Sequence, residues 1–274
     1  QDGRVDGGGE MRGRRPGAAG FTLIEVIVVI AVISILAAMA VPYAVKIIDQ
    51  SREESTKKQM EEIYRAIMGD PKGPTAGYLG DMGRLPTAPP ALMLTNLNTQ
   101  GTQAGQTTGT LGVKYGWYGP YVKIGYSAGA YLVDGWGTNL SYNNPGAGQI
   151  TSYGPNRVAG GGDDIVYPSS AVVPGGRLLV NLYVWDNTQY RQNPAPAQVT
   201  AMGVTFYYSN NGNQASVTRT IPLPLPYSFN GYHAGLHEVT GTCTLVGSPG
   251  AATGQAVVFV PGNNQQAVLN LYLR

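Results

Sequence analysis

A single apolar run near the N-terminus limits what this chain can fold into. Between Val26 and Val41 the chain has sixteen consecutive residues, of which only Ser34 is polar. Extended to Phe21–Val45, the run forms a helix of roughly 37 Å at 1.5 Å per residue, which is enough to cross the ~30 Å hydrocarbon core of a bilayer. We therefore expect one membrane-spanning helix over residues 21–45. The alternative, a cleaved secretory signal peptide, would have a shorter apolar stretch before its cleavage site.

Glu25 is the one acidic residue in this run. A carboxylate in hydrocarbon costs about 2.5–3.5 kcal/mol on insertion scales, so Glu25 should have a partner. Cleavage between Gly20 and Phe21 would create an α-amino cation close to this acid, and the two groups could pair between packed helices. The alternative is that Glu25 lies in the headgroup zone, where the dipole of a helix N-terminus favours an acid.

The start of the run resembles the prepilin peptidase site of type IV pilins and type II secretion pseudopilins, because it reads Gly20-Phe21-Thr22-Leu23-Ile24-Glu25. The resemblance implies that a membrane peptidase cuts between Gly20 and Phe21 and methylates the new amine of Phe21. It also implies that Phe21 and Glu25 take part in assembly. Pro42 stands where members of this family often have a helix-loosening proline.

The leader implied by this cleavage is residues 1–20. Arg12, Arg14 and Arg15 precede the cut, and basic residues before a span keep that end in the cytoplasm. We therefore expect a single-pass protein of the bacterial inner membrane with a cytoplasmic N-terminus. The rest of the chain would be periplasmic or part of an extracellular filament. A start at Met11 would leave residues 1–10 outside the protein.

Charged residues gather in the first third of the chain. Residues 1–84 hold 22 of the 34 Asp, Glu, Lys and Arg side chains. Those after the apolar run, such as Glu53 and Lys57, are spaced for i,i+4 pairs on a solvated helix face. The helix is predicted to continue to Met68, where Gly69-Asp70-Pro71 ends it. We take residues 21–70 as one helical element.

Residues 71–168 contain five short motifs in the order found in the major pseudopilin of type II secretion. They are Asp81-Met82-Gly83-Arg84-Leu85-Pro86-Thr87, Trp117-Tyr118-Gly119-Pro120-Tyr121, Asp134-Gly135-Trp136-Gly137, Ser152-Tyr153-Gly154 and Asp164-Ile165. With the helix, the resemblance covers residues 20–168. It implies an α+β pilin fold, in which the long helix packs on a small antiparallel sheet. Residues 125–133 and 139–143 are predicted hairpin strands, and residues 98–112 are predicted to be an insertion of low order.

The resemblance also implies a calcium site, because the last loop of this region binds calcium in the family. The implied ligands are the side chains of Ser152, Asn156 and Asp164, with backbone carbonyls near Tyr153 and Gly161. Asn156 replaces the usual aspartate, which removes one negative charge, and Asp163 could compensate. The alternative is an ordinary Asx-type turn with solvated carboxylates.

After Pro168 the sequence changes to short β-prone runs. They are residues 177–185, 199–209, 216–223, 236–245, 255–260 and 267–273. Their spacing predicts an all-β antiparallel sandwich of about seven strands over residues 169–274, which looks Ig-like or transthyretin-like. Cys243 is expected to be buried as a small hydrophobe. No third convergent ligand accompanies His233 and His237 beside Glu238, so we expect no metal there.

The leading functional interpretation is structural. The chain would be a subunit of a type II secretion pseudopilus or type IV pilus-like filament, assembled through its N-terminal helix and supporting protein export. The implied partners are further copies of the chain, other pilins or pseudopilins, the prepilin peptidase and an inner-membrane assembly platform.

Two other interpretations stay open. One is a surface type IV pilin or minor pilin whose sandwich adheres to a ligand or partner, and the other is a monomeric membrane-anchored binding protein. No enzymatic activity is expected, because the sequence contains no nucleophile elbow, P-loop or paired-carboxylate site. The net charge of +2 indicates no nucleic-acid partner.

Overall fold

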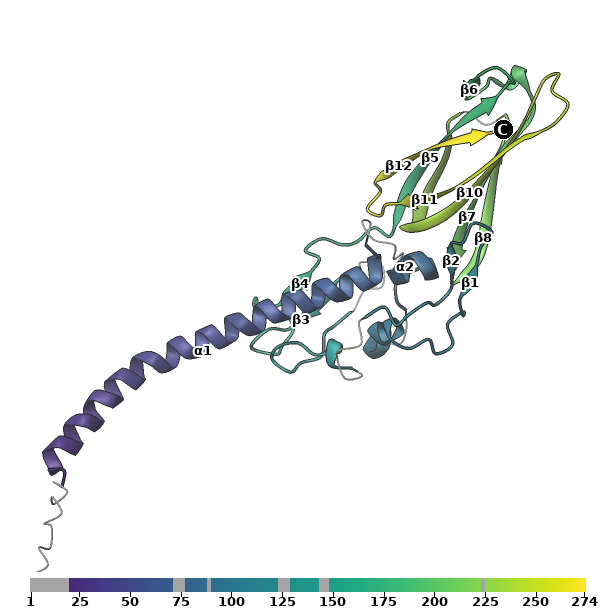
Figure 1. Cartoon of the computed structure of the whole chain (residues 1–274). Coiled ribbons are helices and arrows are strands. Elements are labelled where there is room, and N and C mark those ends of the chain that lie inside the picture. The colour runs from purple at the N-terminus through teal and green to yellow at the C-terminus, as the bar shows by residue number, and fades with distance from the viewer. Residues whose placement is uncertain (1–19, 71–76, 88–89, 123–128, 143–147, 223–224) are drawn as a thin grey trace, which may run out of the picture. The chain divides into compact units, whose positions relative to one another are not determined.

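The structure is a computed structural model that describes residues 20–70, 77–87, 90–122, 129–142, 148–222 and 225–274. The helices are α1 (Leu23–Met68), α2 (Gly77–Met82) and three short 3-10 segments, η1 (Pro90–Leu97), η2 (Ala130–Leu132) and η3 (Pro196–Gln198). Two units are compact in themselves, Gln1–Asp49 and Gln50–Arg274. The predicted leader residues 1–19 and Pro71 lie outside the described residues. Figure 1 shows the chain and its labelled elements.

The predicted long helix is confirmed as α1. It runs through Pro42 without a break and ends at Met68, directly before Gly69. The φ angle of Gly69 is 79°, and its N–H donates to the carbonyl of Arg65 at 2.8 Å. A left-handed glycine after the last turn is a common way to end a helix, because it satisfies a carbonyl that has no helical partner.

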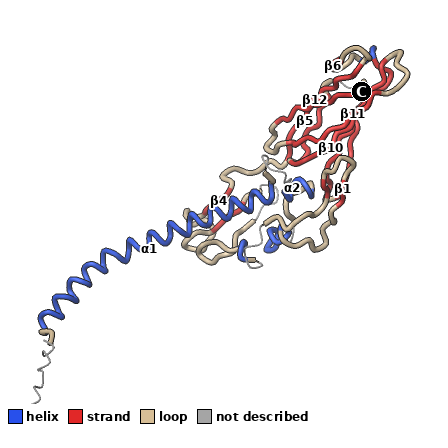
Figure 2. Tube along the Cα trace, in the orientation of Figure 1, coloured by secondary structure: helices blue, strands red, loops and turns tan. Residues whose placement is uncertain are grey.

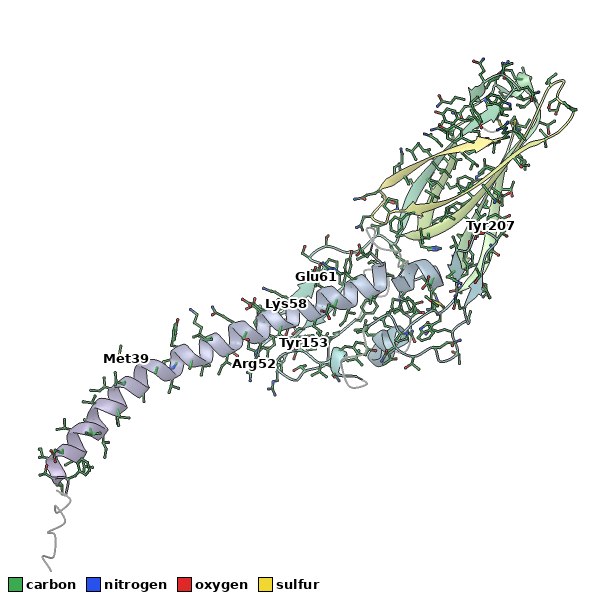
Figure 3. All side chains as sticks on the ribbon, in the orientation of Figure 1. Met39, Arg52, Lys58, Glu61, Tyr153 and Tyr207 are labelled. Atoms are coloured by element: carbon green, nitrogen blue, oxygen red, sulfur yellow. The ribbon has the colours of Figure 1, made fainter. Side chains whose placement is uncertain are left out.

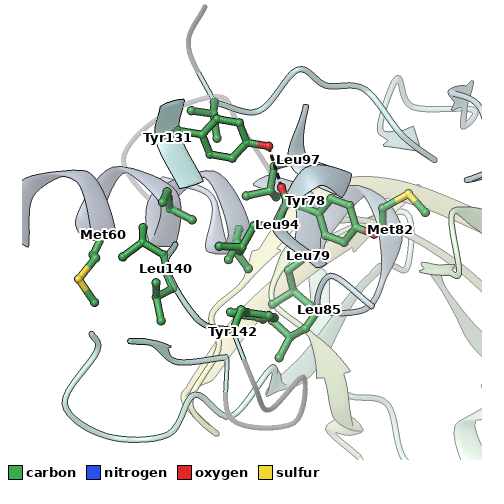
Figure 4. Close-up of a cluster of buried hydrophobic side chains, with 14 of the residues drawn as sticks. Met60, Tyr78, Leu79, Met82, Leu85, Leu94, Leu97, Tyr131, Leu140 and Tyr142 are labelled. Carbon is green, nitrogen blue, oxygen red and sulfur yellow. Dashed lines mark hydrogen bonds between the residues drawn. The ribbon is translucent and has the colours of Figure 1, made fainter. Parts of the chain in front are cut away.

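The last five turns of α1 supply one side of a hydrophobic core. Thr56, Met60, Ile63 and Ile67 are its buried residues, and their spacing places them on one helix face. This face packs against α2, η1 and the side chains of Tyr131, Leu140, Tyr142 and Ile150. Figure 4 shows the cluster around Met60, Leu79, Leu94 and Tyr142. We call residues 50–168 the helix-packed part.

Two small antiparallel pairs of strands complete this part. They are β1 (Thr107–Thr108) with β2 (Lys114–Tyr115), and β3 (Ile150–Ser152) with β4 (Ile165–Tyr167). The ring of Tyr64 on α1 meets that of Tyr167 on β4 edge to face, with 5.4 Å between centroids. Residues 98–112 are thus folded and contain β1, so the prediction of a low-order insertion is wrong. The N–H of Trp117 donates to Ala104 in this segment at 2.8 Å.

The predicted hairpin strand at residues 129–133 is also wrong, while residues 125–128 lie outside the described residues. Ala130–Leu132 is a 3-10 turn, and only an isolated bridge joins Val133 to Asn139. The carbonyls of Tyr131 and Val133 instead accept from the amide of Gln59 on α1, at 2.7 and 2.9 Å. Gln59 thus ties this turn to α1, while the N–H of Leu140 donates to the carbonyl of Leu132 at 2.7 Å.

In its described residues, the C-terminal region is a sandwich of eight strands, two more than the predicted runs. The strands are β5 (Gly175–Trp185), β6 (Tyr190–Gln192), β7 (Val199–Asn210), β8 (Asn213–Thr220), β9 (Tyr227–His233), β10 (Gly235–Leu245), β11 (Ala252–Val260) and β12 (Gln266–Leu273). One sheet has the order β11-β10-β7-β8, and in the other β12, β6 and β9 all pair with β5. Figure 2 shows these strands in red. The β12–β5 pair is parallel, whereas a wholly antiparallel sandwich was predicted.

The sandwich has its own core and shares a junction with the helix-packed part. Its core is a separate cluster that includes Leu182, Phe206 and Val239. At the junction, Glu238 Oε1 accepts from the N–H groups of Leu111 and Val113 at 2.7 and 3.2 Å. The Ser209 hydroxyl donates to the carbonyl of Asp81 at 2.6 Å. The predicted boundary between residues 168 and 169 stays a prediction.

Candidate functional site

The first candidate site is the N-terminus of α1, where Thr22 and Glu25 form hydrogen bonds with each other. The N–H and the hydroxyl of Thr22 each donate to Glu25 Oε2 at 2.9 Å. The N–H of Glu25 donates back to the Thr22 hydroxyl at 3.3 Å. This reciprocal arrangement is a capping box, which satisfies two N–H groups that a helix N-terminus leaves unpaired. Thr22 was not among the predicted site residues, although the Thr-x-x-Glu spacing signals this motif.

Gly20 and Phe21 lie directly before this cap, and both are exposed within their unit. The Phe21 side chain is 87% exposed. Since the helix begins at Leu23, the predicted scissile bond lies outside the helix. A bond outside the helix can enter a peptidase site without unwinding a turn.

The described residues of the N-terminal unit form no core that would cover its apolar side chains. Every residue from Leu23 to Ile48 is exposed within the unit, and most are Val, Ile, Leu or Ala. Figure 3 shows these side chains around the helix, with Met39 labelled. Among the described residues, α1 is the one helix long and apolar enough to cross a membrane. A helix that is apolar on all sides is stable only in lipid or among other helices.

The second candidate site is the loop from Tyr153 to Asp164. The β3–β4 pair closes it, since Ser152 and Ile165 are Cα partners in the ladder. Gly154, Gly160 and Gly162 have φ angles of 61°, 89° and 83°. Residues with a Cβ rarely adopt such angles, so the glycines let this loop turn back on itself.

The predicted ligand Asn156 forms its side-chain hydrogen bonds within the loop. The Asn156 amide donates to Asp163 Oδ1 at 2.6 Å, and its carbonyl oxygen accepts from the N–H of Val158 at 2.7 Å. A Cβ on Gly161 would lie 1.9 Å from the Asn156 amide nitrogen, so the loop is closely packed there. Tyr153 is half-buried at the start of the loop.

Ser152 faces away from the loop acids. Its hydroxyl donates to Asp134 Oδ2 at 2.6 Å and accepts from the N–H of Gly154 at 3.2 Å. Asp134 was not among the predicted site residues. It comes from the Asp-Gly-Trp-Gly turn, and no local pattern could reveal that this turn lies beside Ser152.

Asp164 carries the clearest sign of a cation site. Its Oδ2 accepts from the N–H of Gly160 at 2.8 Å, but its Oδ1 is buried without a hydrogen-bond partner. A buried carboxylate oxygen without a donor is costly. Asp163 and Asp164 line a hollow of about 410 Å³ together with Glu53 and Lys57 of α1. Two adjacent carboxylates and nearby loop carbonyls fit the oxygen ligands that calcium prefers.

The histidines and the cysteine of the sandwich are buried. His237 faces the carbonyls of Tyr207 and His233 at 3.2 and 2.9 Å. Burial lowers the pKa of His237 to about 4 and raises the pKa of Cys243 to about 11. Among the described residues, no three His, Cys, Asp or Glu side chains group together as metal ligands.

Comparison with known proteins gives one match, at the N-terminus. Residues 15–41 match the family model of the prokaryotic N-terminal methylation motif. The chain matches no curated protein and no solved structure. The matched segment contains the predicted cleavage site, the capping box and the start of the apolar helix. It supports the recognition of this chain as a type IV pilin-like protein, a group that includes the pseudopilins.

Proposed function

We propose that the chain is a structural subunit of a type II secretion pseudopilus or a closely related type IV pilus-like filament that supports protein export. The observation that carries this proposal is an apolar helix that is exposed on all sides within its unit and whose first part lies inside the match to the methylation motif. In the membrane, lipid covers this surface, and in a filament the same helices of other copies replace the lipid. The subunit acts by assembly and not by catalysis.

The proposal includes processing and placement. A prepilin peptidase cuts between Gly20 and Phe21 and methylates the Phe21 amine, and an inner-membrane platform then assembles the mature subunits. Before assembly the chain spans the inner membrane once, with its N-terminus in the cytoplasm and residues 50–274 in the periplasm. The arginines before the cut favour this orientation.

Mass spectrometry of the mature protein from a host with a prepilin peptidase tests the proposal. The expected product begins at N-methylated Phe21. Gly20→Val is the control that should keep its leader. A Cβ at position 20 meets nothing within 4 Å, so this change acts on cleavage and not on the fold. An unprocessed wild-type chain in such a host would contradict the proposal.

A second candidate function is supported by the sandwich. It has its own core, and it adds a large surface to a subunit whose assembly needs only the helix. We propose as the alternative that the chain is a surface type IV pilin or minor pilin whose sandwich binds a partner.

We also propose that the loop at residues 152–164 binds calcium. The support is the buried, unpartnered Oδ1 of Asp164 beside Asp163. Bound calcium would supply the positive charge that this oxygen lacks. It would also fix the loop against α1, because Glu53 and Lys57 lie on the same hollow.

A further inference from the structure

One outward face of the sandwich carries four clustered aromatic side chains. They are Tyr183 and Trp185 on β5, Tyr190 on β6 and Tyr272 on β12, and we call them the aromatic cluster. The rings of Tyr183 and Tyr272 stack with 4.9 Å between centroids. Tyr190 meets Tyr272 edge to face at 5.2 Å and Trp185 at 5.0 Å. Tyr190 and Tyr272 remain 41% and 53% exposed, so part of the cluster faces solvent.

A row of amides crosses the same strands beside the rings. The Asn193 amide donates to Asn181 at 3.1 Å, and the Asn181 amide donates to Asn270 at 3.0 Å. Asn270 lies two residues before Tyr272 on β12, and Asn181 lies two residues before Tyr183 on β5. Residues two apart on a strand share a face. The exposed side chain of Asn270 is therefore the outer end of an amide row beside the aromatic cluster.

The exposed charge of this face is positive. The sandwich sequence contains four arginines and two acids, Asp186 and Glu238. Glu238 is buried at the junction. Asp186 is engaged by Thr188, Gln189 and Arg191, and the hydroxyl of Thr188 contributes most to lowering the pKa of Asp186.

Two of the arginines belong to this face. The guanidinium of Arg274 lies over the Trp185 ring, 5.7 Å from its centroid. Arg177 is exposed and shares the outward parity of β5 with Tyr183. A partner on this face therefore meets aromatic rings, amides and two guanidinium groups, while the side chain of Asp186 is paired with Arg191.

This face lies away from the junction with the helix-packed part. The junction uses residues such as Ser209, Gly212 and Glu238, whereas the aromatic cluster includes the last residue of β5. In Figure 1, β6 and the end of β12 lie at the end of the sandwich opposite α2. Among the described residues of 50–274, the packing of the helix-packed part thus leaves Tyr190 and Tyr272 exposed.

We propose that this face binds an acidic polysaccharide. Ring faces are electron-rich and pack against the polarised C–H groups of sugar rings. The amide row supplies donors and acceptors for sugar hydroxyls, and Arg274 and Arg177 suit the carboxylates of the polymer. The positive charge of the face selects an acidic over a neutral chain. This inference deepens the second candidate function, in which the sandwich is the binding module.

The test measures binding of the detergent-solubilised full chain to polygalacturonate, with dextran as the neutral polymer and oligo(dT) as the nucleic acid. We expect polygalacturonate to bind more tightly than the other two polymers, and we expect added salt to weaken its binding. Tyr272→Ala should weaken binding by about tenfold or more, which corresponds to about 1.4 kcal/mol. Tyr118→Ala is the matched control, because Tyr118 is an exposed tyrosine, 60% exposed, outside the sandwich. It should bind like the wild-type chain.

Two further variants keep the test decisive if Tyr272→Ala does not fold. Asn270→Ala should weaken binding to all sugars, and Arg274→Gln should weaken binding to polygalacturonate but not to dextran. The proposal is overturned if polygalacturonate does not bind, if these variants bind like the wild-type chain, or if oligo(dT) binds more tightly. If the polysaccharide proposal fails this test, the proposals of processing at Gly20 and of filament assembly still stand, because they are tested by other measurements.

Discussion

Glu25 can serve two purposes, and one substitution separates them. Its carboxylate caps α1 through Thr22, and it is also the proposed partner of the Phe21 amine of a neighbouring subunit. The cap needs only an acceptor at this position, because glutamine also forms capping boxes. Pairing with an amine in a dry interface needs the negative charge.

We therefore predict that Glu25→Gln keeps the helix and loses the filament. Residues 50–274 should fold as in the wild-type chain, because their core does not include Glu25. Filament yield, measured by shearing and electron microscopy, should fall strongly. Thr22→Ala is the matched control, since it weakens the cap but keeps the acid. Normal filaments from Glu25→Gln would reduce the role of Glu25 to capping.

At Asp164 the prediction concerns calcium. A ligand that binds only the folded state stabilises it by mass action, by about 2.7 kcal/mol at a concentration of 100 Kd. Millimolar calcium should therefore raise the melting temperature of the full chain, and EDTA should reverse the rise. Asp164→Asn should abolish the shift, because it removes the charge of the unpartnered oxygen. Asp186→Asn is the control, because it removes an acid outside the loop and should leave the calcium-dependent shift unchanged. If calcium does not move the melting curve of the wild-type chain, the loop is only a turn.

The elements differ in how far the sequence predicts them. The end of α1 and most sandwich strands follow from local patterns, namely apolar periodicity, Gly69 after Met68, and the alternation on β5 and β10. β9 escapes detection because its sequence, Tyr-Ser-Phe-Asn-Gly-Tyr-His, contains Asn and Gly. The sequence does not predict the 3-10 turn at Ala130–Leu132, whose region bonds to Gln59, about seventy residues earlier in the chain.

The residues of the candidate sites also divide into those that a local sequence pattern predicts and those that it does not predict. The cleavage site and the capping box are contiguous in sequence, so their residues can be read directly. The arrangement around Ser152 depends on Asp134, and the burial of Glu238 depends on the N–H groups of Leu111 and Val113. Contacts of this kind arise only when distant segments pack, and a single sequence carries no local signal for them.

Packing of the Asp134–Gly137 turn against α1 gives a prediction at the scale of elements. A Cβ on Gly135 would lie 2.8 Å from the Arg52 carbonyl and 2.9 Å from the Arg52 Cβ. Gly135→Ala should therefore push the turn off the helix and cost about 1–3 kcal/mol of unfolding free energy. Urea titration of the full chain measures this loss. Gly250→Ala is the control, because a Cβ there meets nothing within 4 Å. Equal stability of the two variants would show that the turn is not fixed to α1.

At the scale of the molecule, three buried ionisable groups lie near the junction of the sandwich with the helix-packed part. Burial raises the pKa of Asp81 to about 7, against a hydrogen bond from Tyr121 that lowers it. Burial lowers the pKa of His233 to about 3 and that of His237 to about 4. Folding therefore favours the uncharged form at all three positions.

These shifts predict how stability depends on pH between about 4.5 and 6. In this window the unfolded chain binds about two protons at the histidines, whereas the folded chain binds about one, at Asp81. The contribution of the two histidines to the stability of the folded chain decreases as the pH falls, whereas the contribution of Asp81 decreases as the pH rises. The free energy of unfolding should therefore increase by about 1.4 kcal/mol for each unit by which the pH rises.

Asp81→Asn removes the carboxyl group that opposes this increase. Urea titrations of this variant across the same pH window should therefore give a slope about twice as steep. Asp186→Asn, the control, should keep the wild-type slope. An unchanged slope in Asp81→Asn would show that Asp81 is ionised in the folded chain and that its burial at the junction is incomplete.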